Sequence, residues 1–351
     1  MGVLQENRVI VAVTGASVAA FGIFAFNHFL RQYRYWNSEF KEVGNVKELF
    51  LYPIKSGKSM NIEWMDCKKN GAKYNENGDR HFLVVDEKAN HLFLTARQYP
   101  KLVLIDSKVI DDILIMTVPN GYTVKINLKE VKSQQDIRNG ILHFKKTQEG
   151  FDCGDEAAEF LENFLETKNK RKLRLLYFNS DLKTERNYTS KSEFWKNPVP
   201  ILPDYPAYQD LASFMATTEA SVDELNSRLE KLESNVKCKV SARNFRPNIS
   251  IEGTKPFDED WWLDVKIGEA EFACFKPCTR CIMTTVNPDT GKFDKNMQPF
   301  RLLKSYRLTP KGKLRDLYQD SPIFGVNMII KKEGRIKVGD KVFVRYKPSP
   351  F

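Results

Sequence analysis

Two cysteines near the end of the chain are the residues whose types and spacing point most directly to chemistry. The segment Phe275–Cys281 reads FKPCTRC, so Cys278 and Cys281 form a C-x-x-C pair with Arg280 between them. Sulfur side chains at this spacing serve as metal ligands, as redox pairs or as buried packing residues. The surrounding sequence helps to choose among these uses.

Zinc and thioredoxin-like chemistry are both disfavoured by what surrounds the pair. A structural zinc site needs four ligands, but no second C-x-x-C is present and the four histidines are scattered over the first 143 residues. A thioredoxin-like pair sits between a strand and a helix, whereas strand-like runs flank this motif. Two interpretations stay open. One is a single thiolate ligand to a soft transition metal, with Arg280 lowering the thiol pKa, and the other is a buried structural pair.

Basic and hydroxyl side chains form a second group of candidates. Lys55 and Ser56 share one loop, Arg80 follows Gly78-Asp79, and Arg97 follows Thr95-Ala96. The segment 243–248 reads RNFRPN and adds two further arginines. Arginine pairs bidentately with phosphate, and lysine and serine add donors. If the fold brings these residues together, they would bind one anionic ligand.

The elements that must position these residues are mostly short strands. Val46–Tyr52 is expected as a strand that ends at Pro53. Further strands are expected at Phe82–Asp86, Leu92–Thr95, Leu102–Ile105, Ile113–Val118, Leu173–Phe178, Ile249–Ile251, Asp264–Ile267, Ala270–Phe275, Met283–Val286, Met328–Ile330 and Lys341–Arg345. Because open sheet edges invite aggregation, so many short strands favour closure into a barrel.

Two helices and one long connection complete the pattern. Apolar residues recur at helical spacing over Glu156–Phe164. Ser221–Glu224 reads as a capping box that opens a helix ending near Leu232. Between these helices, residues 179–208 are rich in Pro, Ser, Asn and Tyr and are expected to connect two domains.

The N-terminal region predicts a membrane anchor. Residues 9–30 contain no charged side chain, and about 20 residues of helix cross a bilayer. A signal peptide is the alternative, but its apolar part is usually about 7–15 residues long. Arg31, Arg34 and Lys41 follow the span, and the positive flank normally stays in the cytosol. The larger C-terminal part is therefore expected to face the cytosol.

Length and composition narrow the number of domains, the class of protein and the kind of partner. The 351 residues suggest two domains, and 42% hydrophobic with 28% charged residues exclude both wholesale disorder and a polytopic membrane protein. The formal charge of +10 favours anionic partners, but no basic run suggests a nucleic-acid arm. Six cysteines are too few for a disulfide-stapled secreted domain, so we expect reduced thiols.

Three motifs together resemble a known family. They are Leu51–Ser56 (LYPIKS), Arg243–Asn248 (RNFRPN) and Cys278–Cys281 (CTRC) followed by TTVNPDTG at residues 284–291. The chain resembles the MOSC proteins, and within them the subfamily of mitochondrial amidoxime-reducing components, from about Val46 to Val344 and also in its anchor. The resemblance implies an α+β, mainly β protein: an N-terminal β-rich MOSC domain and a C-terminal MOSC β-barrel behind one transmembrane helix.

The expected organisation follows from this resemblance and the patterns above. It comprises a tail at 1–8, the transmembrane anchor at 9–30, a juxtamembrane linker at 31–45, the N-terminal domain at 46–178, the connection at 179–208, the MOSC domain at 209–346 and a tail at 347–351.

The resemblance also implies a binding site for molybdenum-molybdopterin, held between the two domains. The second motif cysteine, Cys281, would bind the metal and act in catalysis. The residues expected to contact the cofactor are Lys55, Ser56, Arg80, Asp210, Leu211, Ala212, Arg246, Asn248, Thr279, Arg280 and Asn327. Three places depart from the family pattern: Thr279 replaces a serine, the Asp210–Ala212 loop lacks hydroxyls, and Asn327 replaces a tyrosine.

The implied activity is reduction of N-oxygenated compounds such as amidoximes and N-hydroxylated amines. Electrons would come from NADH through cytochrome b5 reductase and cytochrome b5, without pyridoxal phosphate. The implied location is the outer mitochondrial membrane, with the catalytic part facing the cytosol, and the alternatives are the endoplasmic reticulum and the peroxisome. A sulfurase-like or sulfur-carrying protein that handles the cofactor is the alternative function, although no linked lyase domain with a Schiff-base lysine is apparent.

Overall fold

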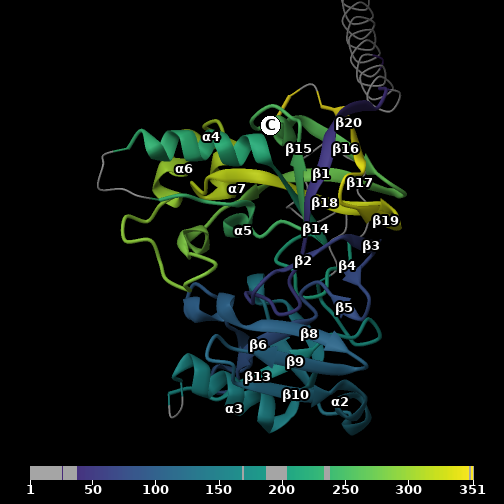
Figure 1. Ribbon diagram of the computed structural model, residues 1–351, viewed down its shortest axis with the longest axis vertical. Helices are drawn as coiled ribbons and strands as arrows, with labels where there is room; N and C mark the ends of the chain where they lie inside the picture. The colour runs from purple at the N-terminus through teal and green to yellow at the C-terminus, as the bar shows by residue number, and fades with distance from the viewer. Residues whose placement is uncertain are drawn as a thin grey trace, which may run out of the picture.

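The fold is described from a computed structural model that covers residues 26, 38–167, 170–186, 204–232, 238–347 and 349–350. Two β-barrels lie end to end along the long axis of the molecule (Figure 1). The predicted mainly β architecture with barrel closure is confirmed. Among the described residues, no helix has the length and apolar composition needed to cross a membrane. The expected anchor, apart from Phe26, and residues 31–37 of the linker lie outside the described residues.

The barrel of the C-terminal half is a ring of seven strands. In order around the ring these are β15 (Ile249–Glu252), β14 (Phe214–Thr218), β18 (Ile323–Lys332), β17 (Ala270–Thr279), β16 (Trp262–Ile267), β20 (Lys341–Tyr346) and β1 (Lys41–Leu51). The ring closes because β1 also pairs with β15, from Asn45 opposite Glu252 to Leu49 opposite Ile249. A short strand, β2 (Met60–Ile62), adds to the other edge of β1.

This closure does not follow the expected division of the chain at residue 46. Strand β1 precedes the N-terminal barrel in sequence but hydrogen-bonds to β15 and β20 of the C-terminal barrel. Val46, Leu49 and Leu51 are buried in the core of that barrel. A four-stranded sheet pairs a late strand with three early ones. Its order is β19 (Gly334–Lys337), β3 (Trp64–Lys68), β4 (Gly71–Tyr74) and β5 (Asn77–Gly78).

The N-terminal half contains a smaller closed barrel and a three-stranded sheet. The barrel consists of β11 (Ile137–Ile141), β12 (Thr147–Asp152), β13 (Leu173–Tyr177), β6 (Phe82–Asp86) and β7 (Leu92–Phe93). The sheet consists of β8 (Asp106–Ile110), β9 (Ile113–Thr117) and β10 (Thr123–Asn127). In β9 the side chains of Leu114 and Met116 are buried while their neighbours are half-buried, as the alternation of a strand requires.

Helices cover the outside of both barrels (Figure 1). They are α2 (Leu128–Gln134), α3 (Gly154–Leu165), α4 (Glu219–Glu230), α5 (Ala242–Phe245), α6 (Phe300–Tyr306) and α7 (Lys313–Tyr318). Short 3₁₀ helices are η1 (Glu87–Ala89), η2 (Pro100–Leu104), η3 (His143–Lys145), η4 (Asp258–Trp261) and η5 (Ile282–Thr285). The expected helix at residues 156–164 is confirmed as α3, which buries Phe160 and Leu161.

Two expected strands are wrong, and both are 3₁₀ helices. Residues 102–105 fall largely in η2, where Pro100 at the first position has the fixed φ that begins a helix. Residues 283–286 fall largely in η5. There Thr284 Oγ1 donates to the Cys281 carbonyl at 3.0 Å and Thr285 Oγ1 donates to the Ile282 carbonyl at 2.7 Å, which stabilises a turn in place of a ladder.

The start of α4 also differs from the expected capping box. The N-cap residue is Thr218, whose hydroxyl accepts from the Ser221 main-chain N–H at 3.3 Å. Ser221 therefore lies in the first turn and does not precede it. Its hydroxyl instead donates to the buried Glu259 carboxylate at 2.9 Å.

Candidate functional site

The residues expected to contact the cofactor gather around one cavity. Its volume is about 340 Å³, and its walls come from both halves of the chain. All twelve candidate residues line it: Lys55, Ser56, Arg80, Asp210, Leu211, Ala212, Arg246, Asn248, Thr279, Arg280, Cys281 and Asn327. Segments separated by more than 200 residues thus converge on one site, a relationship that spacing along the chain does not reveal.

The C-x-x-C motif forms one wall, where strand β17 ends and η5 begins. Cys281 is the N-cap of η5, it is partly exposed, and it lines the cavity. Its carbonyl accepts from the Thr284 N–H at 3.1 Å, which fixes the main chain that carries the thiol. Burial raises the pKa of the Cys278 thiol, and the charge of Arg280 only partly opposes this. Cys281 therefore lines the cavity from a hydrogen-bonded turn.

Arg280 is a positioning residue in this wall. Its side chain is 8% exposed, and its guanidinium donates to the Phe324 carbonyl from Nε at 2.8 Å and to the Phe245 carbonyl from Nη1 at 2.8 Å. The main-chain N–H of Arg280 donates to the Pro322 carbonyl at 2.7 Å. These bonds tie the cysteine segment to β18 and α5, so they hold the cavity wall in place.

Two arginines form another part of the cavity wall and pack against Tyr52. The guanidinium of Arg80 lies 4.5 Å from the centroid of the Tyr52 ring, and that of Arg246 lies 4.1 Å from it. Arg80 is held by the buried carboxylate of Asp79, whereas Arg246 donates from Nη1 to the Gly57 carbonyl at 2.8 Å. Burial lowers the pKa of Arg246 to about 10, so the group stays charged at neutral pH.

Arg246 also carries an unused donor. Its Nη2 is buried and has no hydrogen-bond partner among the described residues. A buried unpaired donor is costly, and a charged one more so. Because Arg246 lines the cavity, an anionic ligand bound there is the partner that this donor fits.

Lys55, Asp210 and His143 form a third group. The Lys55 ammonium donates to the Tyr208 carbonyl at 2.6 Å and pairs with the Asp210 carboxylate. His143 Nε2 lies 3.2 Å from the same carboxylate. Burial lowers the pKa of Lys55 to about 8, and the charge of Asp210 opposes that change. Burial would raise the pKa of Asp210, but the charge of Lys55 and the hydrogen bond from His143 hold it well below 3.8.

The remaining predicted residues complete the lining. Ser56 adopts a left-handed conformation with φ of 68°, a strained state that is common at functional sites. Asn248 joins three strands, since its side chain accepts from the Met215 N–H at 3.3 Å and donates to the Phe50 carbonyl at 3.4 Å. Asn327 donates to the Pro277 carbonyl at 3.4 Å.

Several lining residues were missed by the sequence reasoning. Lys276 lies two residues before Cys278 on β17 and is 8% exposed, with its ammonium 4.6 Å from the Tyr318 ring centroid. Burial lowers the pKa of Lys276 to about 8. The spacing of two residues in a strand places both side chains on one face, and this signal could have identified Lys276. Asn244 lies in the RNFRPN segment but was not singled out there, and no local signal in the sequence points to His143.

The residues present fit a molybdopterin-type cofactor. Lys55, Arg80 and Arg246 supply the cationic wall that a phosphate requires, including the unused Arg246 donor. Cys281 supplies an accessible sulfur, a ligand type suited to soft metals. Among the described residues no group of three or more His, Cys, Asp or Glu side chains could hold a metal ion. A single thiolate combined with ligands from an organic cofactor is consistent with that finding.

Comparisons with known proteins agree with this geometry. Residues 43–168 match the MOSC N-terminal beta barrel domain, and residues 206–343 match the MOSC domain. Mitochondrial amidoxime-reducing component 1 of Mus musculus is 36% identical over 335 residues, covering 95% of this chain and 91% of that protein. Mitochondrial amidoxime reducing component 2 of Bos taurus is 37% identical over 305 residues, covering 86% and 84%.

A human relative is similar to nearly the same degree. Mitochondrial amidoxime reducing component 2 of Homo sapiens is 34% identical over 335 residues, covering 95% of this chain and 92% of that protein. The two domain matches together span most of the chain. The chain therefore belongs to the MOSC family, in the group of the mitochondrial amidoxime-reducing components.

Proposed function

We propose that this protein is a molybdenum-cofactor-dependent reductase of N-oxygenated compounds such as amidoximes and N-hydroxylated amines. The observation that carries the proposal is the cavity in which the Cys281 thiol lies together with the cationic side chains of Lys55, Arg80 and Arg246. A thiolate and an anion-binding wall in one cavity are what a metal on a phosphate-bearing organic carrier requires. The names of the relatives support the same activity.

The cofactor would be held from both sides of the cavity. Arg246, Arg80 and Lys55 would bind its phosphate, with Ser56 adding a hydroxyl from the same loop as Lys55. Thr279 and the Asp210–Ala212 loop would contact the pterin, with Asn248 and Asn327 beside them. The thiolate of Cys281 would ligate molybdenum, while Arg280 keeps the cysteine segment in place through the Phe245 and Phe324 carbonyls. Bound here, the cofactor supplies two-electron redox chemistry.

The overall reaction defines what the protein must handle. Reduction of an amidoxime consumes two electrons and two protons, breaks the N–O bond and releases the amidine and water. In the scheme proposed here, electrons come from NADH through cytochrome b5 reductase and cytochrome b5. The protons must reach the cavity, and Lys276 and His143 are among the side chains on its walls that would hold and transfer one.

Localisation is part of the proposal. Residues 9–30 would anchor the protein in the outer mitochondrial membrane with the two barrels in the cytosol, and the endoplasmic reticulum and the peroxisome are the alternatives. The names of the relatives support mitochondrial association. Imaging of the tagged full chain beside markers for the three membranes tests this assignment.

The test of the function compares serine substitutions of the two motif cysteines. The Cys281→Ser variant is expected to lose bound molybdenum and benzamidoxime reduction together, whereas Cys278→Ser is expected to keep both. Molybdenum is measured by mass spectrometry of the purified protein, and reduction is measured with cytochrome b5, its reductase and NADH. A wild-type protein that carries persulfide and no molybdenum would instead identify a sulfur-carrying protein. Wild-type levels of both metal and activity in Cys281→Ser would refute the assigned ligand.

A further inference from the structure

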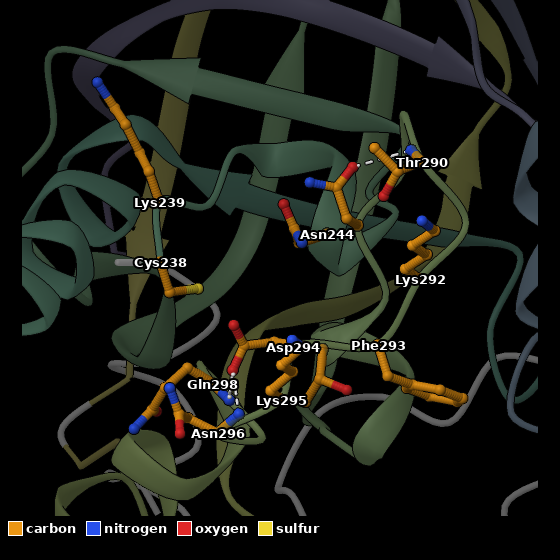
Figure 2. A pocket seen from close by; sticks show the side chains of 12 residues that line it. Cys238, Lys239, Asn244, Thr290, Lys292, Phe293, Asp294, Lys295, Asn296 and Gln298 are labelled. Carbon is orange, nitrogen blue, oxygen red and sulfur yellow. Dashed lines mark hydrogen bonds between the residues drawn. The ribbon is translucent and has the colours of Figure 1, made fainter. Parts of the chain in front are cut away.

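A second cavity of about 470 Å³ lies beside the first, behind the segment that carries Cys281. The loop from Thr285 to Gln298 and the segment from Cys238 to Asn244 form its walls (Figure 2). Three lysines stand around it, and we call Lys239, Lys292 and Lys295 the lysine rim. In Figure 2 Lys239 lies on one side of Asn244 and Lys292 on the other.

One thin layer of protein separates this cavity from the candidate active site. Asn244 lines both cavities, and its Nδ2 donates to the carbonyls of Thr284 at 3.3 Å and Val286 at 3.4 Å. Thr284 lines the first cavity and Thr285 the second. Cys281 is the N-cap of the short helix η5 that ends at Thr285, and a 3₁₀ helix rises about 2 Å per residue. Cys281 therefore lies about 8 Å along the chain from Thr285, which lines the second cavity.

The lysine rim carries positive charge that no ion pair within the described residues neutralises. Some exposed lysines elsewhere pair with carboxylates, as Lys101 does with Glu166 and Lys341 with Glu42. The three rim lysines are exposed, and their ammonium groups form no ion pair or hydrogen bond within the described part of the chain. The nearby Asp294 offsets them only in part, because it supplies one negative charge against three, and its Oδ1 accepts from the main-chain N–H groups of Asn296 and Gln298 at 2.9 Å.

We propose that the lysine rim is the docking surface for an acidic electron-transfer protein that reduces the site at Cys281. This inference rests on the proposed reductase function. Each docking event would deliver one electron, the donor being oxidised by one electron, and two events would supply one turnover. Unpaired cations around a concave surface attract a partner rich in carboxylates, and the attraction raises its association rate. The short path through η5 makes this face suited to electron delivery.

The experiment compares two triple variants with the same change in net charge. The rim variant carries K239E, K292E and K295E. The matched control carries K88E, K108E and K125E, three exposed lysines of the N-terminal half that also lack ion pairs among the described residues. The probe is soluble cytochrome b5, an acidic haem protein, and its Kd is measured by calorimetry at low and high ionic strength. Surface substitutions of this kind change stability little, and thermal melts verify folding.

Preferential loss in the rim variant supports the proposal. Its Kd is expected to rise at least tenfold at low ionic strength and to lose most of its dependence on salt, whereas the control Kd changes less than threefold. Equal weakening in both variants would show that net charge alone steers the partner, and unchanged binding in the rim variant would place docking elsewhere. Either result overturns the proposal.

A chemical reductant separates this inference from the proposed function. With dithionite as the electron source, the rim variant is expected to reduce benzamidoxime at the wild-type rate, because its lysines do not line the cavity of Cys281. If the wild-type protein loaded with molybdenum cofactor does not reduce benzamidoxime with dithionite, the reductase function fails. If the wild-type protein reduces benzamidoxime with dithionite but the rim variant binds cytochrome b5 with the wild-type Kd, only the docking proposal fails.

Discussion

Arg80 donates a hydrogen bond of 3.0 Å from Nη2 to the main-chain carbonyl of Arg246, although 166 residues separate them in sequence. The two guanidinium groups also lie against the same Tyr52 ring. The two positive charges repel each other because both guanidinium groups pack on one ring. Among the described residues, the buried carboxylate of Asp79 forms an ion pair with Arg80 only. The arrangement therefore holds positive charge ready for an anion at the cavity wall.

Arg246 should contribute strongly to cofactor retention. We expect Arg246→Met to weaken pterin binding about ten- to hundredfold, the usual effect of losing hydrogen bonds from a charged donor. Fluorescence of the oxidised pterin extracted from purified protein measures the occupancy. Arg243→Met is the matched control, because Arg243 lies in the same segment but pairs with Asp289 and does not line the cavity. Equal pterin loss in both variants would contradict this role.

Lys55 should make anion binding depend on pH. Since its pKa is about 8, the ammonium is charged below that pH and becomes neutral above it, so affinity for an anionic ligand should fall as pH rises through 8. Titration of cofactor-free protein with molybdopterin from pH 7 to 9.5 measures this fall. Lys55→Met should bind more weakly and show a shallower pH dependence.

Two variants keep the test of Lys55 specific. Lys58→Met removes an exposed lysine of the same loop, which pairs with Asp106 at 3.1 Å, and should behave as wild type. Lys276→Met removes the other cavity lysine with a pKa of about 8 and identifies its share of the pH dependence. An unchanged pH curve in Lys55→Met would exclude Lys55 as the titrating group.

Glu259 should make folding stability fall with rising pH. Burial, followed by the charge of Asp260, raises its pKa to about 7 from an ordinary 4.5. The folded state thus binds more protons than the unfolded chain between these values, so this contribution to stability is full below about pH 4.5 and is lost as pH rises through 7. Glu259→Gln should remove that slope and be more stable than wild type at pH 8 by roughly 3 kcal/mol.

Urea denaturation at pH 5, 6, 7 and 8 measures the effect of Glu259. The control is Glu63→Gln, an exposed position whose change should leave the slope intact. A wild-type slope in Glu259→Gln would assign the pH dependence to other groups.

Gly325 should be required for the close approach of β18 to β14. Its φ is +77°, and a Cβ there would lie 2.6 Å from the Ala216 carbonyl oxygen and 3.1 Å from Arg280 Nη2. We expect Gly325→Ala to destabilise the fold by roughly 2–4 kcal/mol through strain and the clash, and to lower molybdenum content by displacing Arg280. Gly339→Ala has a similar φ of +87° but open space around it, so it should cost only about 1 kcal/mol. Similar losses of folding stability in both variants would show that the structure relieves the clash at Gly325 without an energetic cost.

Most of the candidate site could be predicted because its residues belong to compact motifs. Cys281, Lys55 and Arg246 each lie in a short segment with a recognisable pattern, and all three line the cavity. Lys276 and His143 reach the cavity through strand register and barrel closure, which depend on pairings between distant segments. Such pairings leave little trace in a single sequence.

The errors in the fold have a similar physical origin. Residues 102–105 and 283–286 are short apolar runs, for which strand and helix cannot be told apart by periodicity. Hydroxyl-to-carbonyl bonds and a proline decided both in favour of 3₁₀ turns. The capping residue of α4 was displaced by three positions because Ser221 serves the buried Glu259 instead of the helix end.

The position of β1 has a consequence for the order of events during synthesis. Its partner β20 ends only at Tyr346, about 300 residues later, so the larger barrel cannot close until that residue has left the ribosome. The smaller barrel, complete by Tyr177, is free to form earlier. During that interval β1 has an unpaired edge, and newly made chains held at this stage are the ones exposed to aggregation and in need of chaperones.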